Sequence, residues 1–162
     1  MVTLRVITPD DWPLWRALRI AALTDAPHAF KTRLADWHNG EEERWRARLE
    51  IPGAYHVAAM LDELAVGMAS GLPTDGDTRE LRSVWVGSEA RGHGVGTRLI
   101  SAVEAWAQET GAATLKLAVI PGNEPAIVLY RRNGFVDAGE LGDVLPDGVT
   151  RELIMVKSVR CT

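Results

Sequence analysis

Three glycines stand at alternate positions between an apolar segment and an amphipathic segment. They are Gly92, Gly94 and Gly96, and they follow the apolar residues 84–86. A helix that begins here leaves its first main-chain N–H groups without intrahelical partners, and its dipole favours negative charge. Glycines let a phosphate approach these groups because no Cβ stands in the way. We therefore interpret the segment as a site for a phosphate-bearing ligand.

The spacing of these glycines differs from two common phosphate-binding loops. A Walker A loop requires Lys after its last glycine, whereas Thr97 follows Gly96 here. A dinucleotide fingerprint requires Gly-x-Gly-x-x-Gly, which is also absent from this stretch. The observed pattern is Arg-x-x-Gly-x-Gly, formed by Arg91, Gly94 and Gly96. An ordinary strand-to-helix turn that uses glycine only for close packing is the alternative interpretation.

A second motif lies one expected helix and one expected strand further along the chain. It reads Asn-x-x-Ala-x-x-Leu-Tyr-x-x-x-Gly-Phe, from Asn123 to Phe135. Together with the glycine motif, and in the same order, it resembles the pair of motifs that mark the GNAT superfamily of N-acetyltransferases. The resemblance covers residues 79–135 closely. It implies acetyl transfer from acetyl-CoA to a primary amine of a small molecule, peptide or protein, by direct attack in a ternary complex.

The resemblance also implies how the coenzyme binds. The strand residues 84–86 would present main-chain groups to the pantetheine arm, and one N–H near Trp85 or Val86 would stabilise the oxyanion. Asn123 would hydrogen-bond the arm, while Tyr130 would lie near the thioester sulfur. The implied coenzyme-binding residues are Val84, Trp85, Val86, Arg91, Gly92, His93, Gly94, Val95, Gly96, Thr97, Asn123 and Tyr130.

The reaction needs a proton donor and a proton acceptor. Tyr130 is the expected general acid, because a phenol with a reference pKa of about 10 can protonate the leaving thiolate; packing on a helix face is its alternative role. Glu80 is the candidate base for the attacking amine, with a water chain or a merely solvated carboxylate as alternatives. His28 and Phe30 follow the first expected helix, in a loop that often lines the acceptor pocket in this family.

Composition sets the broad class of protein. The 162 residues are 46% hydrophobic and 25% charged, as expected for a single soluble domain spanning residues 1–162. The net charge of −4 disfavours nucleic-acid binding. Neither a signal peptide nor a membrane-spanning run is recognisable, so we expect a cytoplasmic protein. The scattered His residues and single Cys predict no metal site. The resemblance also admits a homodimer, which is common in that family.

Hydrophobic periodicity predicts a mixed α/β fold with about seven strands and four helices. The helices are expected from about residue 10 to 24, 40 to 51, 96 to 111 and 124 to 132. The strands are expected at 3–7, 55–60, 64–72, 79–86, 114–119, 135–141 and 151–157. The second, third and fourth should form an antiparallel meander, and the last two a hairpin. The fourth and fifth should be parallel because a helix connects them. The resemblance implies that the twisted, mostly antiparallel sheet splays between these two strands.

Two other functions remain open at this point. One is a non-catalytic acyl-CoA-binding or sensor domain that keeps the phosphate site. The other is a nucleotide-binding protein that uses the same loop for ATP.

Overall fold

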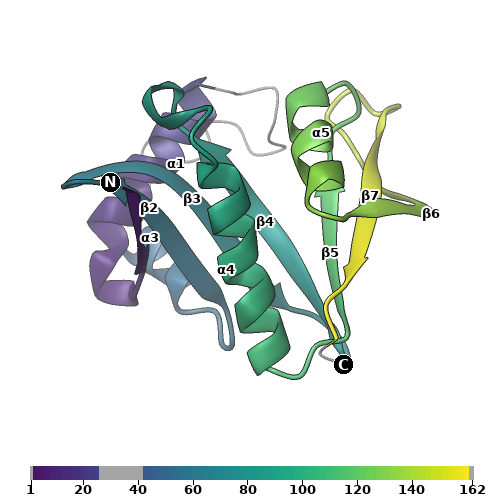
Figure 1. Ribbon diagram of the computed structural model, residues 1–162, viewed down its shortest axis with the longest axis horizontal. Coiled ribbons are helices and arrows are strands. Elements are labelled where there is room, and N and C mark those ends of the chain that lie inside the picture. The colour runs from purple at the N-terminus through teal and green to yellow at the C-terminus, as the bar shows by residue number, and fades with distance from the viewer. Residues whose placement is uncertain (1, 26–41, 161–162) are drawn as a thin grey trace.

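A computed structural model describes residues 2–25 and 42–160 of the chain (Figure 1). Two short 3-10 turns, η1 (Pro9–Asp11) and η3 (Ser88–Ala90), accompany the main elements. In chain order these are β1 (Val2–Val6), α1 (Trp12–Asp25), α3 (Glu42–Leu49), β2 (Tyr55–Leu61), β3 (Leu64–Pro73), β4 (Thr78–Val86), α4 (Val95–Glu109), β5 (Thr114–Val119), α5 (Glu124–Arg132), β6 (Val136–Val144) and β7 (Arg151–Ser158).

All seven strands form one sheet in the order β1-β2-β3-β4-β5-β7-β6. Every neighbouring pair is antiparallel except β4 and β5, which are parallel. The predicted meander of β2, β3 and β4 and the predicted β6–β7 hairpin are both confirmed. The hairpin joins the sheet through β7, so β6 becomes an outer strand.

The parallel pair stays together over a short distance only. Its register has three positions, which end at Glu80 opposite Lys116. Beyond Glu80, β4 continues for six residues to Val86 and β5 continues to Val119, with no further pairing. Figure 1 shows the two strands separating toward α5. The predicted splay between the fourth and fifth strands is therefore confirmed.

One face of the sheet is covered by α4 and α5. On α4, Leu99, Ile100 and Val103 are fully buried, as their three- and four-residue spacing predicts. They pack in one cluster with alternate residues of β5, such as Leu115 and Leu117. The apolar stripe of the helix and the two-residue period of the strand therefore meet in one core.

The other face is covered by α1 and α3. Trp15 of α1 and Trp45 of α3 are buried against Ala58 and Met68 from β2 and β3. These two tryptophans therefore belong to the core. The long apolar side chains hold both helices beside the split.

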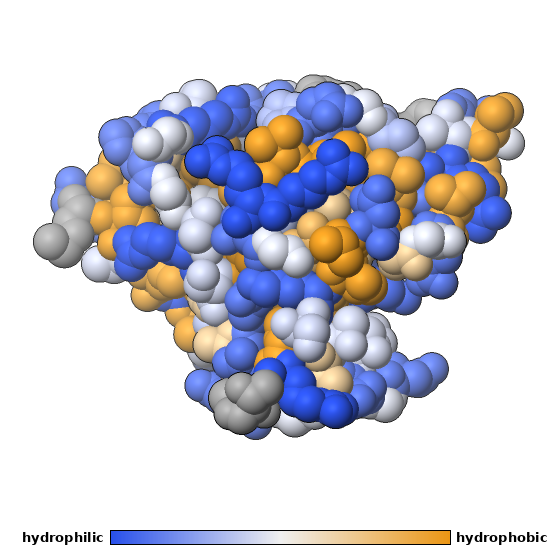
Figure 2. Space-filling model, turned by 45° about the vertical axis from the view of Figure 1, so that its right-hand side comes forward, coloured by the Kyte–Doolittle hydropathy of each residue, from blue (hydrophilic) through white to orange (hydrophobic). Residues whose placement is uncertain are grey.

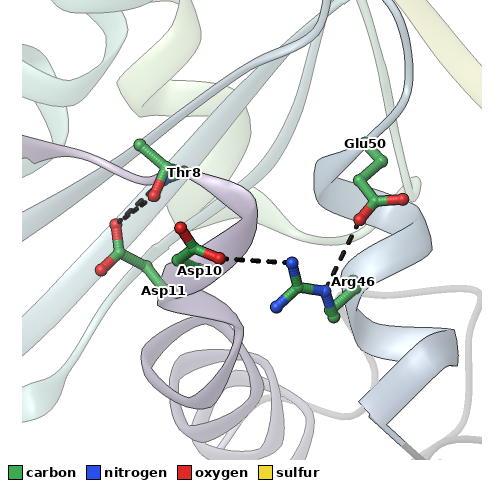
Figure 3. A network of polar contacts seen from close by, with 5 residues as sticks. All are labelled: Thr8, Asp10, Asp11, Arg46 and Glu50. Carbon is green, nitrogen blue, oxygen red and sulfur yellow. Dashed lines mark hydrogen bonds and ion pairs between the residues drawn. The ribbon is translucent and has the colours of Figure 1, made fainter.

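A polar network joins the start of α1 to α3. The Arg46 guanidinium on α3 contacts Asp10 at 3.3 Å and Glu50 at 3.6 Å (Figure 3). Beside it, the Asp11 carboxylate accepts hydrogen bonds from the Thr8 main-chain N–H at 2.9 Å and the Thr8 hydroxyl at 3.1 Å. The helix start predicted near residue 10 is thus present as the turn η1, which leads into α1.

The outer strand β6 carries exposed apolar side chains. Val136, Leu141 and Val144 are each more than half exposed. In Figure 2, where the side of the molecule with β6 and β7 comes forward, hydrophobic residues stand among hydrophilic ones.

Within residues 2–25 and 42–160, no helix has the length and apolarity that crossing a membrane requires.

Candidate active site

The loop before α4 has the backbone conformation that its glycines suggest. Gly92 and Gly94 have φ values of 84° and 73°, in the left-handed region that L-residues avoid. Gly94 is the N-cap of α4, and no atom lies within 4 Å of a Cβ added at either glycine. The first N–H groups of α4 therefore adjoin open space at the helix N-terminus.

Gly96 has a different role from its two neighbours. It is buried in the first turn of α4, and a Cβ there would lie 3.0 Å from the Leu129 side chain of α5. Close packing, the alternative interpretation of the glycines, therefore applies to Gly96. Gly96 is thus explained by close packing, whereas Gly92 and Gly94 leave open space beside the start of α4.

A cleft of about 870 Å³ runs from this loop along the end of β4 to α5. All the residues predicted to bind a coenzyme, except one, lie along its walls. They are Val84, Trp85, Val86, Arg91, Gly92, Gly94, Val95, Gly96, Thr97, Asn123 and Tyr130. The exception is His93, whose side chain is exposed and which does not line the cleft. That these residues bind a coenzyme stays a prediction.

Arg91 fastens the loop to the rest of the protein. Its Nε donates to the Val86 carbonyl at 2.9 Å, and its guanidinium forms an ion pair with Asp25 at the end of α1. The Trp85 indole donates to the same Asp25 carboxylate at 3.0 Å. Asp25 also lines the cleft. No local sequence pattern predicts this position for Asp25, because it lies sixty-six residues before its partner Arg91. The position of the loop thus depends on a contact between distant segments.

The end of β4 turns main-chain groups toward the split. Gly87 donates its N–H to Val66 on β3 at 2.7 Å, so the preceding residue points its main-chain groups the other way. The Val86 carbonyl accordingly accepts a bond from Arg91 rather than from β3. The Val86 N–H therefore faces the split, on the side where β5 has moved away.

A bulge precedes this end of β4. The register changes from Met68 opposite Trp85 to Ser70 opposite Arg82, and Ser83 has a left-handed φ of 58°. A bulge leaves one residue unpaired and re-aims the strand beyond it. Arg19 of α1, which is buried, donates to the Ser83 hydroxyl at 3.1 Å. The sequence carries no glycine or other signal for this bulge.

Tyr130 lies on the buried side of α5. Its ring contacts Phe135 edge-on with centroids 6.0 Å apart, and only 9% of the residue is exposed. Burial raises the pKa of the Tyr130 phenol to about 12. The group is thus protonated at neutral pH, as a proton donor must be.

A second cavity, of about 570 Å³, opens on the other side of the split. It shares four wall residues with the cleft, namely Val84, Asn123, Ala126 and Tyr130. Glu80 lines this cavity, and its carboxylate accepts a hydrogen bond from Arg82 Nε at 2.9 Å. Tyr130 and Glu80, predicted from distant parts of the sequence, therefore share one cavity. The two residues predicted to line the acceptor pocket, His28 and Phe30, lie outside the described residues.

Metal ligands are not grouped in this site. Among residues 2–25 and 42–160, no three His, Cys, Asp or Glu side chains are placed to hold a metal ion. The chemistry that the described residues offer is hydrogen bonding, main-chain electrostatics and proton transfer.

Comparison with known proteins gives consistent matches. Residues 15–135 match the family described as the acetyltransferase (GNAT) family. An IAA acetyltransferase of Azospirillum brasilense is 34% identical over 79 residues, which are 49% of this chain and 52% of that protein. A mycothiol acetyltransferase of Clavibacter sepedonicus is 29% identical over 137 residues, which are 85% of this chain and 43% of that protein. The chain thus spans about half the length of these curated relatives.

The fold also matches solved structures. A Salmonella typhimurium protein described as an acetyltransferase, solved with its cofactor acetyl-CoA, superposes with a TM-score of 0.76 at 19% identity. The match covers 100% of this chain and 96% of that one. At this identity the likeness concerns the fold.

Proposed function

Because the chain belongs to the acetyltransferase (GNAT) family, we propose that it transfers an acetyl group from acetyl-CoA to a primary amine. The observation that carries the proposal is that the cleft and the second cavity meet at Tyr130. A coenzyme in the cleft and an acceptor in the cavity would bring the thioester and the amine together. Direct attack then needs no covalent enzyme intermediate.

The cleft suits a coenzyme with a diphosphate and a long polar arm. The diphosphate would bind at the N-terminus of α4, beside Gly92 and Gly94, where N–H groups and the helix dipole favour negative charge. The pantetheine arm would follow the end of β4. Asn123 supports this placement, because it is the N-cap of α5 but makes no side-chain cap hydrogen bond. Its amide is thus available to a ligand in the cleft.

The oxyanion that forms during attack would bind the Val86 N–H. This N–H faces the split, and β4 is held from behind by the bond from Gly87 to Val66. A donor that is already fixed needs no reorganisation when charge develops, and one such donor contributes roughly 3–4 kcal/mol to transition-state stabilisation. The fold would thus supply the electrostatic part of catalysis through its main chain.

Two side chains would handle the protons. Tyr130 would protonate the leaving thiolate, since its raised pKa of about 12 keeps the phenol neutral and able to donate. The burial that raises this pKa would also raise that of a thiol at the same place, which keeps the two groups matched. Glu80, in the cavity, would accept the proton of the ammonium group directly or through water.

Coenzyme binding tests the first half of the proposal. Coenzyme A should raise the melting temperature of the protein, whereas ATP and NAD at equal concentration should not. Stabilisation by ATP but not by coenzyme A would support the nucleotide-binding alternative instead.

The variant Tyr130→Phe tests the second half. With an amine that the protein acetylates, the variant should lose roughly 10²- to 10⁴-fold in kcat while its Kd for coenzyme A stays the same. A non-catalytic acyl-CoA-binding domain predicts coenzyme binding by both forms and no release of thiol from acetyl-CoA with any amine. A variant as active as the wild type would remove Tyr130 from the mechanism.

A further inference from the structure

The second cavity has walls of opposite charge. Its positive wall comes from α1, α3 and β4, and its negative wall from β6 and β7. The positive wall consists of Arg19, Arg48 and Arg82; the negative wall consists of Glu140, Asp143 and Glu152. Between the walls, Glu80 of β4 and Lys116 of β5 are neighbours in the parallel register.

The three guanidinium groups of the positive wall are close enough to repel one another. Burial, followed by the charges of Arg48 and Arg82, lowers the pKa of Arg19 to about 10. Burial and the charge of Arg82 also lower the pKa of Arg48. A guanidinium group presents a planar fork of N–H donors that fits carboxylate and phosphate oxygens. This wall therefore attracts an anionic group in the cavity.

The negative wall lies across the sheet from the positive one. A Cβ at Gly142 would lie 3.2 Å from the Glu152 Cβ and 3.3 Å from its Oε1, so Glu152 of β7 packs against the main chain of β6. Glu140, Asp143 and Glu152 line the same cavity. In the sheet, β5 separates β4 from β7. Because neighbouring strands lie about 4.8 Å apart, the backbones of β4 and β7 are separated by roughly 10 Å or more. The cavity volume of about 570 Å³ is in the range of small-molecule sites.

We propose, on the basis of the function proposed above, that the acceptor is an amine that carries its own anionic group, as an amino acid does. The anion would bind the guanidinium groups of Arg19, Arg48 and Arg82. The ammonium group would face the acidic side chains and Glu80, and after losing its proton would reach the thioester beside Tyr130. A polycation would be repelled by the positive wall, and a neutral amine would make no ionic contact with that wall.

An acceptor panel tests this proposal. Release of coenzyme A thiol would be measured for the standard amino acids, for the carboxamide of each, and for spermidine, all at equal total concentrations and at neutral pH, where the ammonium form prevails. The best amino acid should exceed its carboxamide roughly tenfold or more in kcat/KM. A carboxamide or spermidine that reacts equally well or better would overturn the proposal.

A binding measurement separates failure of this proposal from failure of the proposed function. Melting temperatures would be recorded with coenzyme A alone, and then with coenzyme A and each amino acid. If coenzyme A stabilises the protein but no amino acid stabilises it further or is acetylated, the acceptor proposal is wrong and the coenzyme assignment stands. If coenzyme A itself has no effect, the proposed function is wrong.

Two arginines on the same helix provide a matched pair of variants. Arg48→Gln should raise KM for the preferred amino acid roughly tenfold or more, and should leave KM for its carboxamide and for acetyl-CoA unchanged. Arg46→Gln removes the same charge from α3, but Arg46 pairs with Asp10 and Glu50 outside the cavity (Figure 3), so its kinetics should match the wild type. Equal effects of both variants, or no effect of Arg48→Gln, would refute the assignment.

Two further variants guard against misfolding. Arg48→Lys keeps the charge without the planar fork and should restore part of the lost affinity. If Arg48→Gln does not fold, Arg82→Gln replaces it, because the Arg82 side chain is 48% exposed and contributes little to packing. Arg82→Gln should raise KM for the amino acid and not for its carboxamide; an unchanged KM would count against the proposal.

Discussion

The strongest test of the phosphate site compares two glycines that have the same conformation in different places. Gly94 and Gly76 have φ values of 73° and 68°, and a Cβ added at either meets no atom within 4 Å. An L-residue in the left-handed region costs roughly 1–2 kcal/mol. Gly94→Ala and Gly76→Ala should therefore lose similar stability, and each kcal/mol lowers Tm by about 2–4 °C in a chain of this size.

Coenzyme affinity should separate the two variants. Gly94 lines the cleft as the N-cap of α4, and its new methyl group would stand where a diphosphate approaches the N–H groups. Gly76 lies in the turn between β3 and β4 and does not line the cleft. Isothermal calorimetry with coenzyme A should show a Kd raised roughly tenfold or more for Gly94→Ala alone.

The result can fail in two separable ways. If both variants bind coenzyme A as the wild type does, the main-chain amides at the start of α4 do not hold its diphosphate. If Gly94→Ala and Gly76→Ala melt at the wild-type temperature, the reasoning from backbone strain is wrong, whatever the affinity.

Three further predictions concern stability. Burial lowers the pKa of His56 from 6.5 to about 4. This shift should add about 3 kcal/mol to the free energy of unfolding above pH 6.5, and the added stability should be lost as the pH falls to 4. In urea unfolding, His56→Gln should lack this acid dependence. Burial raises the pKa of Tyr130 to about 12, so its contribution to the free energy of unfolding should be full below pH 10 and lost between pH 10 and 12. Thermal unfolding across that pH interval should show a smaller loss of stability for Tyr130→Phe than for the wild type. Gly71→Ala would place a Cβ 2.6 Å from Trp106 Cε3, in a ring that stacks on Tyr55. This clash should lower the free energy of unfolding by about 1–3 kcal/mol. A Tm within 1 °C of the wild type would contradict it.

Periodicity and motif spacing predicted most of the fold. The three- and four-residue spacing of Leu99, Ile100 and Val103 marked the buried face of α4, and the motifs at Arg91 and Asn123 located the glycine loop and α5. These features depend on residues close together in the chain, where backbone geometry alone sets which side chains share a face. The strand-to-helix turn and the parallel β4–β5 pair follow from the same local rules.

The candidate site depends more on tertiary packing. Asp25 reaches the loop through Arg91 and Trp85, and Arg19 reaches the bulge at Ser83, although these partners are sixty or more residues apart. No local pattern predicts such contacts, because they depend on how α1 packs on the sheet.

The arrangement of charged side chains around the second cavity also depends on tertiary packing. Sequence alone predicted a glycine turn at the start of a helix and a tyrosine on the helix that comes later in the chain. Only the tertiary structure decided that Arg19, Arg48 and Arg82 share one wall and Glu152 the other, because those side chains come from four separate elements. Their positions depend on how α1 and α3 pack on the sheet and on the insertion of β7 between β5 and β6, and neither has a local signature.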